Sequence, residues 1–336
     1  MSDHHSEPRA RDLLVVDNLR THFFTPEGIV RAVDGVDFAM KQGSILGIVG
    51  ESGCGKTVLG LTIMRLIPDP PGKIVTGNVF FQGVELTALD DLEMRNIRGN
   101  RISMIFQEPM SSLNPVFTIG SQISEVFLLH QKEMAYNKSR ALEMSIEMLK
   151  MVGIEYPAKR IKDYPHQLSG GMCQRIMIAM ALACKPKLMI ADEPTTALDV
   201  TTQAQILDLM IALQQDSGTS IILVTHDLGV VAQTCQDVAV MYTGKVVEFA
   251  SVTDIFLQPL HPYTKGLMKS IPKVGSGLTG KKLPAIPGNV PTFKNMPDGC
   301  TFHDRCPEVM EKCFSQAPPV FRPETGHRVR CWRYEG

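Results

Sequence analysis

One short stretch of this chain restricts its fold more than any other. The apolar run SILGIVG, from Ser44 to Gly50, enters a glycine-rich turn, and VLGLTIMRLI, from Val58 to Ile67, follows with helical spacing. The turn reads GESGCGKT and fits the pattern G-x-x-x-x-G-K-S/T. A strand, this loop and a helix in direct succession are the structural context that the pattern requires.

The composition of the loop predicts that it holds phosphate groups. Glycines let backbone N–H groups curl around phosphate oxygens, and a helix N-terminus adds partial positive charge. We expect Lys56 to reach the β- and γ-phosphates of a nucleotide and the Thr57 hydroxyl to bind Mg²⁺. The alternative is an ordinary glycine turn before a surface helix. The residues predicted to contact nucleotide here are Gly50, Ser52, Gly53, Cys54, Gly55, Lys56 and Thr57.

The nucleotide is predicted to be ATP rather than GTP. GTPases read guanine with an Asn-Lys-x-Asp motif, and the only Asn-Lys pair in this chain, at Asn137, continues with Ser139 and Arg140. The motif is therefore missing, which favours ATP.

A second candidate site lies where another apolar strand ends in two carboxylates. The run KLMIADE, from Lys187 to Glu193, has an apolar lead-in followed by Asp192 and Glu193. Asp192 suits Mg²⁺ coordination through water, and Glu193 suits polarisation of an attacking water. An ordinary acidic strand end is the alternative. Shortly before it, LSGGMCQR, from Leu168 to Arg175, forms a second glycine loop, which alone would be no more than a helix cap.

Taken in order, these motifs resemble the ATP-binding subunits of ABC transporters, over roughly Leu13 to Ala250. The resemblance implies a Q-loop role for Gln107, which would sense Mg²⁺ and the γ-phosphate, and a switch role for His226 at the γ-phosphate. It makes Ala197-Leu198-Asp199 the D-loop. It also implies an aromatic residue that stacks on adenine, for which Phe23 is the first choice and Phe24 the second. Glu193, His226 and Gln107 are then the predicted catalytic residues, with Thr57, Gln107 and Asp192 at Mg²⁺.

The resemblance also implies a dimer. Ser169, Gly170 and Gly171 of one cassette would close over ATP held by the phosphate loop of the other. The signature reads LSGGM where the family most often has LSGGQ. This departure matters less than the serine hydroxyl and the glycine N–H, which address phosphate. ATP-driven closure would then move the helical subdomains against membrane-embedded partners.

Further motifs resemble the bacterial oligopeptide/dipeptide/nickel import branch of the family. They include FQEPMSSLNP from Phe106, HPYTKGLM from His261 and LPAIPG from Leu283. The branch implies two permease subunits, a second ATPase subunit that is a paralogue of this one, and an extracytoplasmic binding protein. Di- or oligopeptides are the expected cargo, with nickel, glutathione or opines as alternatives. A non-transport ABC ATPase is disfavoured, because the chain has no long coiled-coil insertion, and its net charge of −1 gives no basic excess for nucleic acid.

Apolar strands that alternate with helices predict an α/β fold with a mainly parallel sheet covered on both faces. The family resemblance makes this a P-loop NTPase of the ABC cassette type, with an antiparallel β subdomain and a helical subdomain at about 108–168. The predicted domains are a polar tail at 1–12, the nucleotide-binding domain at 13–250 and a small cysteine-containing accessory domain at 251–336. Beyond about Pro272 the sequence shows little periodicity.

The chain is expected in the cytoplasm, because its N-terminus lacks the apolar segment and cleavage site of a secretory signal and its apolar runs are too short for a bilayer span. The family resemblance places it peripherally, at the cytoplasmic face of the inner membrane.

Four of the eight cysteines fall in the tail, with the spacing C-x5-C-x6-C-x17-C. A reducing cytosol argues against disulfides, and structural zinc sites usually have C-x2-4-C pairs. Four thiolates can hold an iron–sulfur cluster, and the import branch implies a 4Fe–4S cluster here. Zinc and free thiols remain as alternatives. The four residues are Cys300, Cys306, Cys313 and Cys331. The other four cysteines are expected to be structural, with Cys184 and Cys235 on apolar helices.

Overall fold

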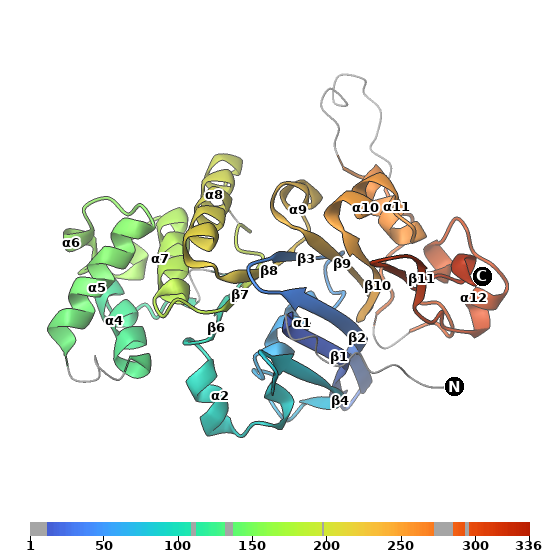
Figure 1. Ribbon diagram of the computed structural model, residues 1–336, viewed down its shortest axis with the longest axis horizontal. Coiled ribbons are helices and arrows are strands. Elements are labelled where there is room, and N and C mark those ends of the chain that lie inside the picture. Colours follow the sequence, from blue (N-terminus) through green and yellow to red (C-terminus); the bar gives the residue numbers. More distant parts are fainter. Residues whose placement is uncertain (1–11, 109–111, 132–136, 197, 272–284, 293–295) are drawn as a thin grey trace, which may run out of the picture. The chain divides into compact units, whose positions relative to one another are not determined.

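The structure is a computed structural model of the chain. It describes residues 12–108, 112–131, 137–196, 198–271, 285–292 and 296–336, so the predicted polar tail lies outside the described residues except for Asp12. The chain divides into two compact units, which are shown in Figure 1. The first unit comprises Met1–Lys41, Ile45–Thr87 and Thr225–Gly336, and the second comprises Gln42–Ser44 and Ala88–Val224.

The first unit contains an antiparallel sheet with the strand order β2-β1-β4-β5. Its strands are β1 (Asp12–Thr25), β2 (Gly28–Lys41), β4 (Gly72–Phe81) and β5 (Val84–Glu85). Side chains that alternate along these strands form a buried layer, in which Leu14, Val36 and Phe81 are completely inaccessible. These strands make up the antiparallel β subdomain that the family resemblance implied.

A second set of strands in the first unit has the order β11-β12-β10-β9-β3. Strand β3 (Ile45–Val49) is buried at every position and pairs in parallel with β9 (Asp237–Tyr242), as expected for an apolar strand covered on both faces. Antiparallel pairing continues from β9 through β10 (Lys245–Ser251) to β12 (His327–Val329) and β11 (Phe321–Glu324). The tail therefore adds two strands that its sequence did not indicate.

The α-helices described in the first unit are short. They are α1 (Lys56–Ile63), α9 (Leu228–Thr234), α10 (Val252–Leu257), α11 (Pro262–Lys269) and α12 (Lys312–Ser315). The predicted helix at 58–67 begins two residues earlier, at Lys56, and ends at Ile63. Cys235 lies just beyond the last residue of α9, so the expectation that it is on a helix is wrong.

Glu248 on β10 fastens the tail segments to the sheet. Its carboxylate accepts hydrogen bonds from the N–H groups of Leu260 and His261, at 2.7 and 2.9 Å, and from His327 Nε2 at 2.7 Å. Burial raises the pKa of Glu248, but its bonds from His327 and the two backbone groups outweigh this and hold the pKa below its usual value. The buried carboxylate is therefore charged and fully used in joining α11 and β12 to β10.

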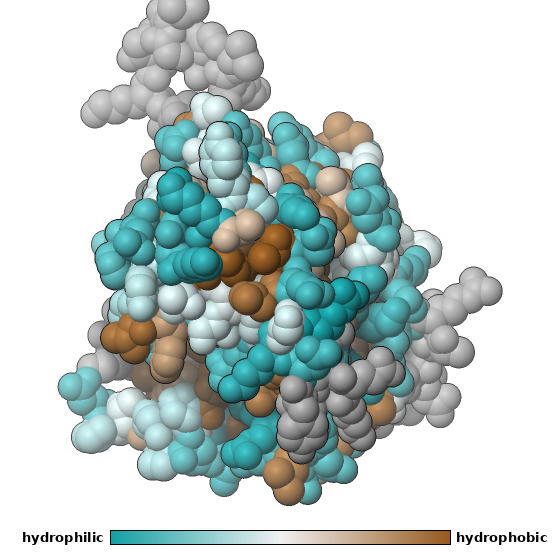
Figure 2. Space-filling view, turned by 90° about the vertical axis from the view of Figure 1, so that its left-hand side faces the viewer, coloured by the Kyte–Doolittle hydropathy of each residue, from teal (hydrophilic) through white to brown (hydrophobic). Residues whose placement is uncertain are grey.

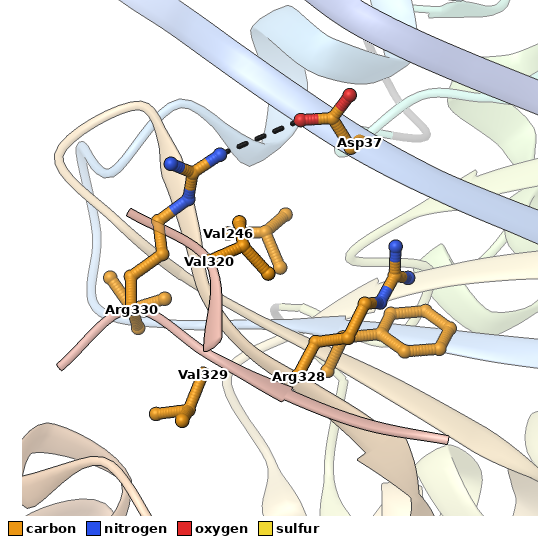
Figure 3. Close-up of a pocket in the computed structure, with 8 residues that line it drawn as sticks. Asp37, Val246, Val320, Arg328, Val329 and Arg330 are labelled. Atoms are coloured by element: carbon orange, nitrogen blue, oxygen red, sulfur yellow. Dashed lines mark hydrogen bonds and ion pairs between the residues drawn. The ribbon is translucent and has the colours of Figure 1, made fainter. Parts of the chain in front are cut away.

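A small pocket lies where the tail meets β2 and β10, and Figure 3 shows its lining. Val246, Val320 and Val329 form its apolar wall. The Arg330 guanidinium reaches Asp37 on β2 at 3.5 Å and donates to the carbonyl of Gly35 at 2.9 Å. These contacts provide a second attachment of the tail, distinct from that at Glu248.

The second unit contains a parallel sheet with the order β8-β7-β6. Its strands are β6 (Ile102–Ile105), β7 (Leu188–Asp192) and β8 (Ser220–Thr225), and β7 confirms the strand predicted in the run KLMIADE. Its helices are α2 (Asp91–Ile97), α4 (Ile119–His130), α5 (Lys138–Met151), α6 (Pro157–Arg160), α7 (Gly170–Leu182) and α8 (Val200–Ser217).

Helices α4, α5 and α7 of this unit pack together (Figure 1). Ile119, Ile123 and Phe127 follow helical spacing along α4 and are completely buried. Burial of each such side chain stabilises the packing by about 2 kcal/mol. The predicted helices between Thr118 and Met151 are confirmed. Helix α7 ends at Leu182, however, so Cys184 lies in the turn that follows and not on the helix as expected.

Candidate nucleotide-binding site

Two glycines of the phosphate loop occupy positions that no larger residue could fill. Gly50 follows β3 with φ 155°, and a Cβ atom there would lie 2.3 Å from the carbonyl oxygen of Met241. Gly55 has φ 99°, and its Cβ would lie 2.1 Å from the carbonyl oxygen of Ala32. Only glycine combines this backbone conformation with such close approach. The sequence pattern thus reflects real steric limits at both ends of the loop.

Lys56 folds back across the loop that precedes it. Its Nζ donates to the carbonyl oxygens of Gly50 and Glu51, at 2.9 and 3.1 Å, and the residue is only 5% exposed. Ser52, Gly53 and Thr57 are exposed. No side chain caps the N-terminus of α1, and its first turn contains no acidic residue. The positive end of the helix dipole is therefore open to an anion, so the loop fits a nucleotide phosphate.

The two aromatic candidates for adenine stacking are neighbours on β1 and point to opposite faces of that strand. The ring of Phe23 packs on Gly72 of β4, where a Cβ would meet it at 2.9 Å. The ring of Phe24 is 49% exposed. Phe23 is thus held by its own sheet, and its predicted contact with adenine stays a prediction.

The second unit brings the Q-loop glutamine and the strand-end glutamate together. Gln107, just beyond β6, donates from Nε2 to Glu193 Oε2 at 3.1 Å. The same oxygen accepts from Thr196 Oγ1 at 2.9 Å. Asp192, the last residue of β7, is 2% exposed. Two polar side chains from separate positions in the chain, Gln107 and Thr196, therefore meet at the Glu193 carboxylate.

The backbone of Glu193 departs from ordinary strand geometry. Its φ of 47° is in the left-handed region, which costs a residue with a side chain of order 1 kcal/mol or more. The Glu193 N–H still donates to the carbonyl of Val224 at 2.9 Å. The turn directs the carboxylate out of the sheet toward Gln107, and strained residues of this kind cluster at active sites.

The glycine signature and the D-loop pack against each other within the second unit. Ser169 caps α7, and its Oγ accepts from the N–H of Met172 at 3.3 Å. A Cβ on Gly171 would lie 2.9 Å from Thr202 Cγ2 at the start of α8. Asp199 caps α8 through Thr202, whose backbone and hydroxyl bonds lower the pKa of this exposed carboxylate. Of the other D-loop residues, Ala197 lies outside the described residues.

His226 is exposed and directly follows β8. The next residue, Asp227, caps α9 by accepting from the N–H of Gly229 at 2.8 Å, which fixes the chain on one side of the histidine. The phosphate loop, Phe23 and His226 belong to the first unit. Gln107, Asp192, Glu193, Asp199 and the glycine signature belong to the second.

The four tail cysteines line one pocket in the first unit, together with Pro262, Phe302 and Trp332. The N–H of Cys300 donates to the carbonyl of Cys313 at 2.8 Å, which ties the two ends of this segment together. Burial raises the pKa of the Cys300 and Cys306 thiols to about 11. Within the described part of the chain, no three His, Cys, Asp or Glu side chains are close enough to hold a single metal ion.

Family models match two regions of the chain. Residues 33–196 match the ABC transporter family, and residues 247–313 match the family described as the oligopeptide/dipeptide transporter C-terminal region. The chain is 52% identical over 98% of its length to a probable peptide ABC transporter ATP-binding protein, y4tR, of Sinorhizobium fredii, of which 97% is covered. The chain belongs to the oligopeptide/dipeptide branch of the ABC transporter family. As an ABC cassette of this family, it is an ATPase.

Another relative of this ABC cassette is the oligopeptide transport ATP-binding protein AppD of Bacillus subtilis, at 51% identity over 96% of this chain and 97% of that protein. Among solved structures, the dimeric ATP-binding cassette MJ0796 bound to ADP and phosphate superposes with a TM-score of 0.64. It shares 29% identity and covers 71% of this chain and 98% of its own. The fold is therefore that of an ABC-type P-loop NTPase. None of the helices described in this cassette has the length and apolarity needed to span a bilayer.

Several contacts of the ABC cassette's phosphate loop were not predicted. The N–H of Glu51 donates to the hydroxyl of Tyr263 at 2.9 Å, and the carboxylate of Glu51 pairs with Arg305. Tyr263 belongs to the HPYT motif, which indicated the import branch but predicted no role for the tyrosine itself. Arg305 lies between two of the tail cysteines, where nothing in the local pattern indicates a partner in the loop.

Proposed function

We propose that this chain is the ATP-hydrolysing subunit of an importer for di- and oligopeptides. The observation that carries the proposal is the presence of both regions in one chain: a cassette with an intact phosphate loop, and a C-terminal region of the oligopeptide/dipeptide type. Relatives that match almost the whole chain are named as peptide, oligopeptide or dipeptide transport ATP-binding proteins. We keep residues 13–250 and 251–336 as the proposed nucleotide-binding and accessory domains.

In the proposed reaction, Glu193 polarises the water that attacks the γ-phosphate. Gln107 and Thr196 orient its carboxylate, because both donate to Oε2. Lys56 and the N-terminus of α1 hold the phosphates, and His226 contacts the γ-phosphate. Thr57, Asp192 and Gln107 would hold Mg²⁺, which neutralises the charge that develops during transfer. These residues mainly position groups and stabilise charge.

The proposed catalytic state is a dimer of this chain with a second ATPase subunit, which we propose to be a paralogue of this chain. Ser169 is exposed at the N-terminus of α7, where helix N–H groups can address phosphate that another chain holds. The solved cassette MJ0796, which shares this fold, is dimeric. Closure over two ATP molecules and reopening after hydrolysis would then provide the mechanical stroke.

Membrane permease subunits are the proposed partners of the second unit, which would put the chain at the cytoplasmic face of the inner membrane. Figure 2 views the chain from the side on which α4, α5 and α6 lie in Figure 1, and hydrophobic patches appear there among hydrophilic residues. Exposed apolar residues on both sides of Gln107 support this location, namely Phe106 just before it and Val116 and Phe117 further along the chain. An extracytoplasmic binding protein would act through the permeases alone.

Reconstitution of the assembled transporter in vesicles tests the proposed function. We expect di- and oligopeptides to stimulate ATP hydrolysis and to accumulate in an ATP-dependent manner. Nickel, glutathione and an opine serve as competing cargoes in the same vesicles. Stimulation by one of these and not by peptides would contradict the peptide assignment, while leaving the importer assignment intact.

We further propose that the four tail cysteines hold a 4Fe–4S cluster with a structural role. The support is that all four line one pocket among apolar side chains, and that a multi-iron cluster accepts four thiolates spaced more widely than the ligands of one ion. When bound, the cluster would cross-link the tail segments.

Elemental analysis of the protein purified without oxygen tests this cluster. We expect iron and acid-labile sulfide in the wild type and the loss of both in Cys306→Ser, since one of four ligands is missing. Cys184→Ser is the matched control, because Cys184 lies outside the pocket, and it should retain the iron. Stoichiometric zinc without iron, or no metal, would contradict the proposal.

A further inference from the structure

Arg305 joins the cysteine-containing tail directly to the phosphate loop. Its Nη1 and Nη2 donate to the two carboxylate oxygens of Glu51, at 2.7 and 2.9 Å. Glu51 is the first residue after Gly50 in the loop, and 254 positions separate it from Arg305. We infer that Arg305 is a positioning residue for ATP binding, which sets the conformation and the charge of the phosphate loop through Glu51.

The guanidinium of Arg305 is itself rigidly held. Nε donates to the carbonyl of Pro287 at 2.9 Å, and Nη1 also reaches the hydroxyl of Tyr242 at 3.3 Å. The residue is 5% exposed. A two-pronged pair in such a site fixes the direction of the carboxylate as well as its distance, which a single bond to lysine would not do.

The carboxylate, the backbone N–H and the carbonyl of Glu51 each have a hydrogen-bond partner. Its carboxylate meets Arg305, its N–H donates to Tyr263, and its carbonyl accepts from Lys56, the phosphate-binding lysine. Lys56 and Arg305 therefore both bond to Glu51, Lys56 at its carbonyl and Arg305 at its carboxylate. A change at Arg305 reaches Lys56 through a single residue.

An aromatic cluster under the loop holds Arg305 in place. Phe302 packs edge-on against Tyr242 and Tyr263, with ring centroids 5.2 and 5.4 Å apart. All three rings are essentially buried. Thr301 adds a hydrogen bond to Thr243 at 2.7 Å. The segment that carries Arg305 is thus packed beneath the loop and forms part of its support.

The ion pair of Glu51 and Arg305 affects ATP binding mainly through the charge of Glu51. A carboxylate beside a site for nucleotide phosphates repels them, and Arg305 neutralises it. Without Arg305, Glu51 would keep its negative charge and become free to turn toward the phosphates. The inference rests on the proposed function only in that the loop binds ATP.

The test is ATP binding and hydrolysis by the full-length chain. We expect Arg305→Ala to raise both KM and Kd for ATP about tenfold, while kcat changes far less. In the double variant Arg305→Ala with Glu51→Gln, the unpaired charge is gone, so most of the lost affinity should return. The defect of the single variant should also shrink at high salt, because added ions screen the exposed charge of Glu51.

Arg330→Ala is the matched control, because Arg330 also joins the tail to the rest of the first unit but pairs with Asp37 on β2 and not with a residue of the loop (Figure 3). It should leave the affinity for ATP near that of the wild type. Normal ATP affinity in Arg305→Ala, an equal defect in Arg330→Ala, or no recovery in the double variant would each overturn the inference. A wild-type chain that bound no ATP would contradict the ATP assignment itself and not the pairing alone.

Discussion

Replacing Glu193 with glutamine should slow ATP turnover at least about a hundredfold while ATP stays bound. Glutamine keeps the shape of the side chain and still offers one oxygen to Gln107 and Thr196, which bond Glu193 Oε2 at 3.1 and 2.9 Å. It cannot polarise water as a carboxylate does. Nucleotide retained after gel filtration, together with the release of phosphate in a single turnover, measures the two effects separately.

Glu108→Gln is the control for this variant. Glu108 is an exposed carboxylate next to Gln107 and has no proposed role in hydrolysis. It should keep most of the turnover, whereas Glu193→Gln should also accumulate as a closed ATP-bound dimer. Hydrolysis by Glu193→Gln at the wild-type rate would show that Glu193 is not the catalytic carboxylate.

Replacing Lys56 with alanine should abolish measurable ATP binding. The change removes the cation that reaches the β- and γ-phosphates, and it also removes the donor that joins the carbonyls of Gly50 and Glu51. Loss of this buried charged donor removes one hydrogen bond from each of the two carbonyls as well as the charge at the phosphates, so a loss of affinity of about a hundredfold or more is expected. Equilibrium binding of a fluorescent ATP analogue measures it.

A thermal melt of Lys56→Ala shows whether the first unit remains folded, and Lys56→Met retains most of the side-chain volume if it does not. Lys73→Ala is the control for net charge, because Lys73 is exposed on β4 of the same unit. It should bind ATP normally. Tight ATP binding by a folded Lys56 variant would remove the argument for the phosphate loop.

Local patterns were sufficient to predict much of this molecule. The phosphate loop could be found because Gly50 and Gly55 obey steric limits that leave a mark in the sequence. The strand that ends at Asp192 could be found because burial on both faces demands an unbroken apolar run. The roles of the site residues were predicted from the order of the motifs, which resembles that of a known family. Most of these roles involve contacts with a nucleotide, Mg²⁺ or a second subunit, so they stay predictions.

Features that depend on distant packing could not be predicted. The pair of Glu51 and Arg305 joins residues 254 positions apart, and no spacing rule connects them. Strands β11 and β12 are short and partly polar, so their two-residue alternation is too brief to be recognised. Helix α7 ends at Leu182, although the apolar run continues to Cys184. The run is longer than the helix because Ala183, in the turn that follows, is buried as well.

The two tail strands also cover the backbone edge of β10, so that the short strand β11 is the edge of the sheet instead. Strand β12 pairs with β10 at Glu248 and Phe249, and the N–H of Arg330 donates to Val247. Strand β10 is buried at its five central positions. Without β12, its unpaired backbone N–H and C=O groups could pair with a strand of another chain. The tail therefore covers this backbone, and we expect a chain shortened before residue 327 to self-associate more readily than the full chain.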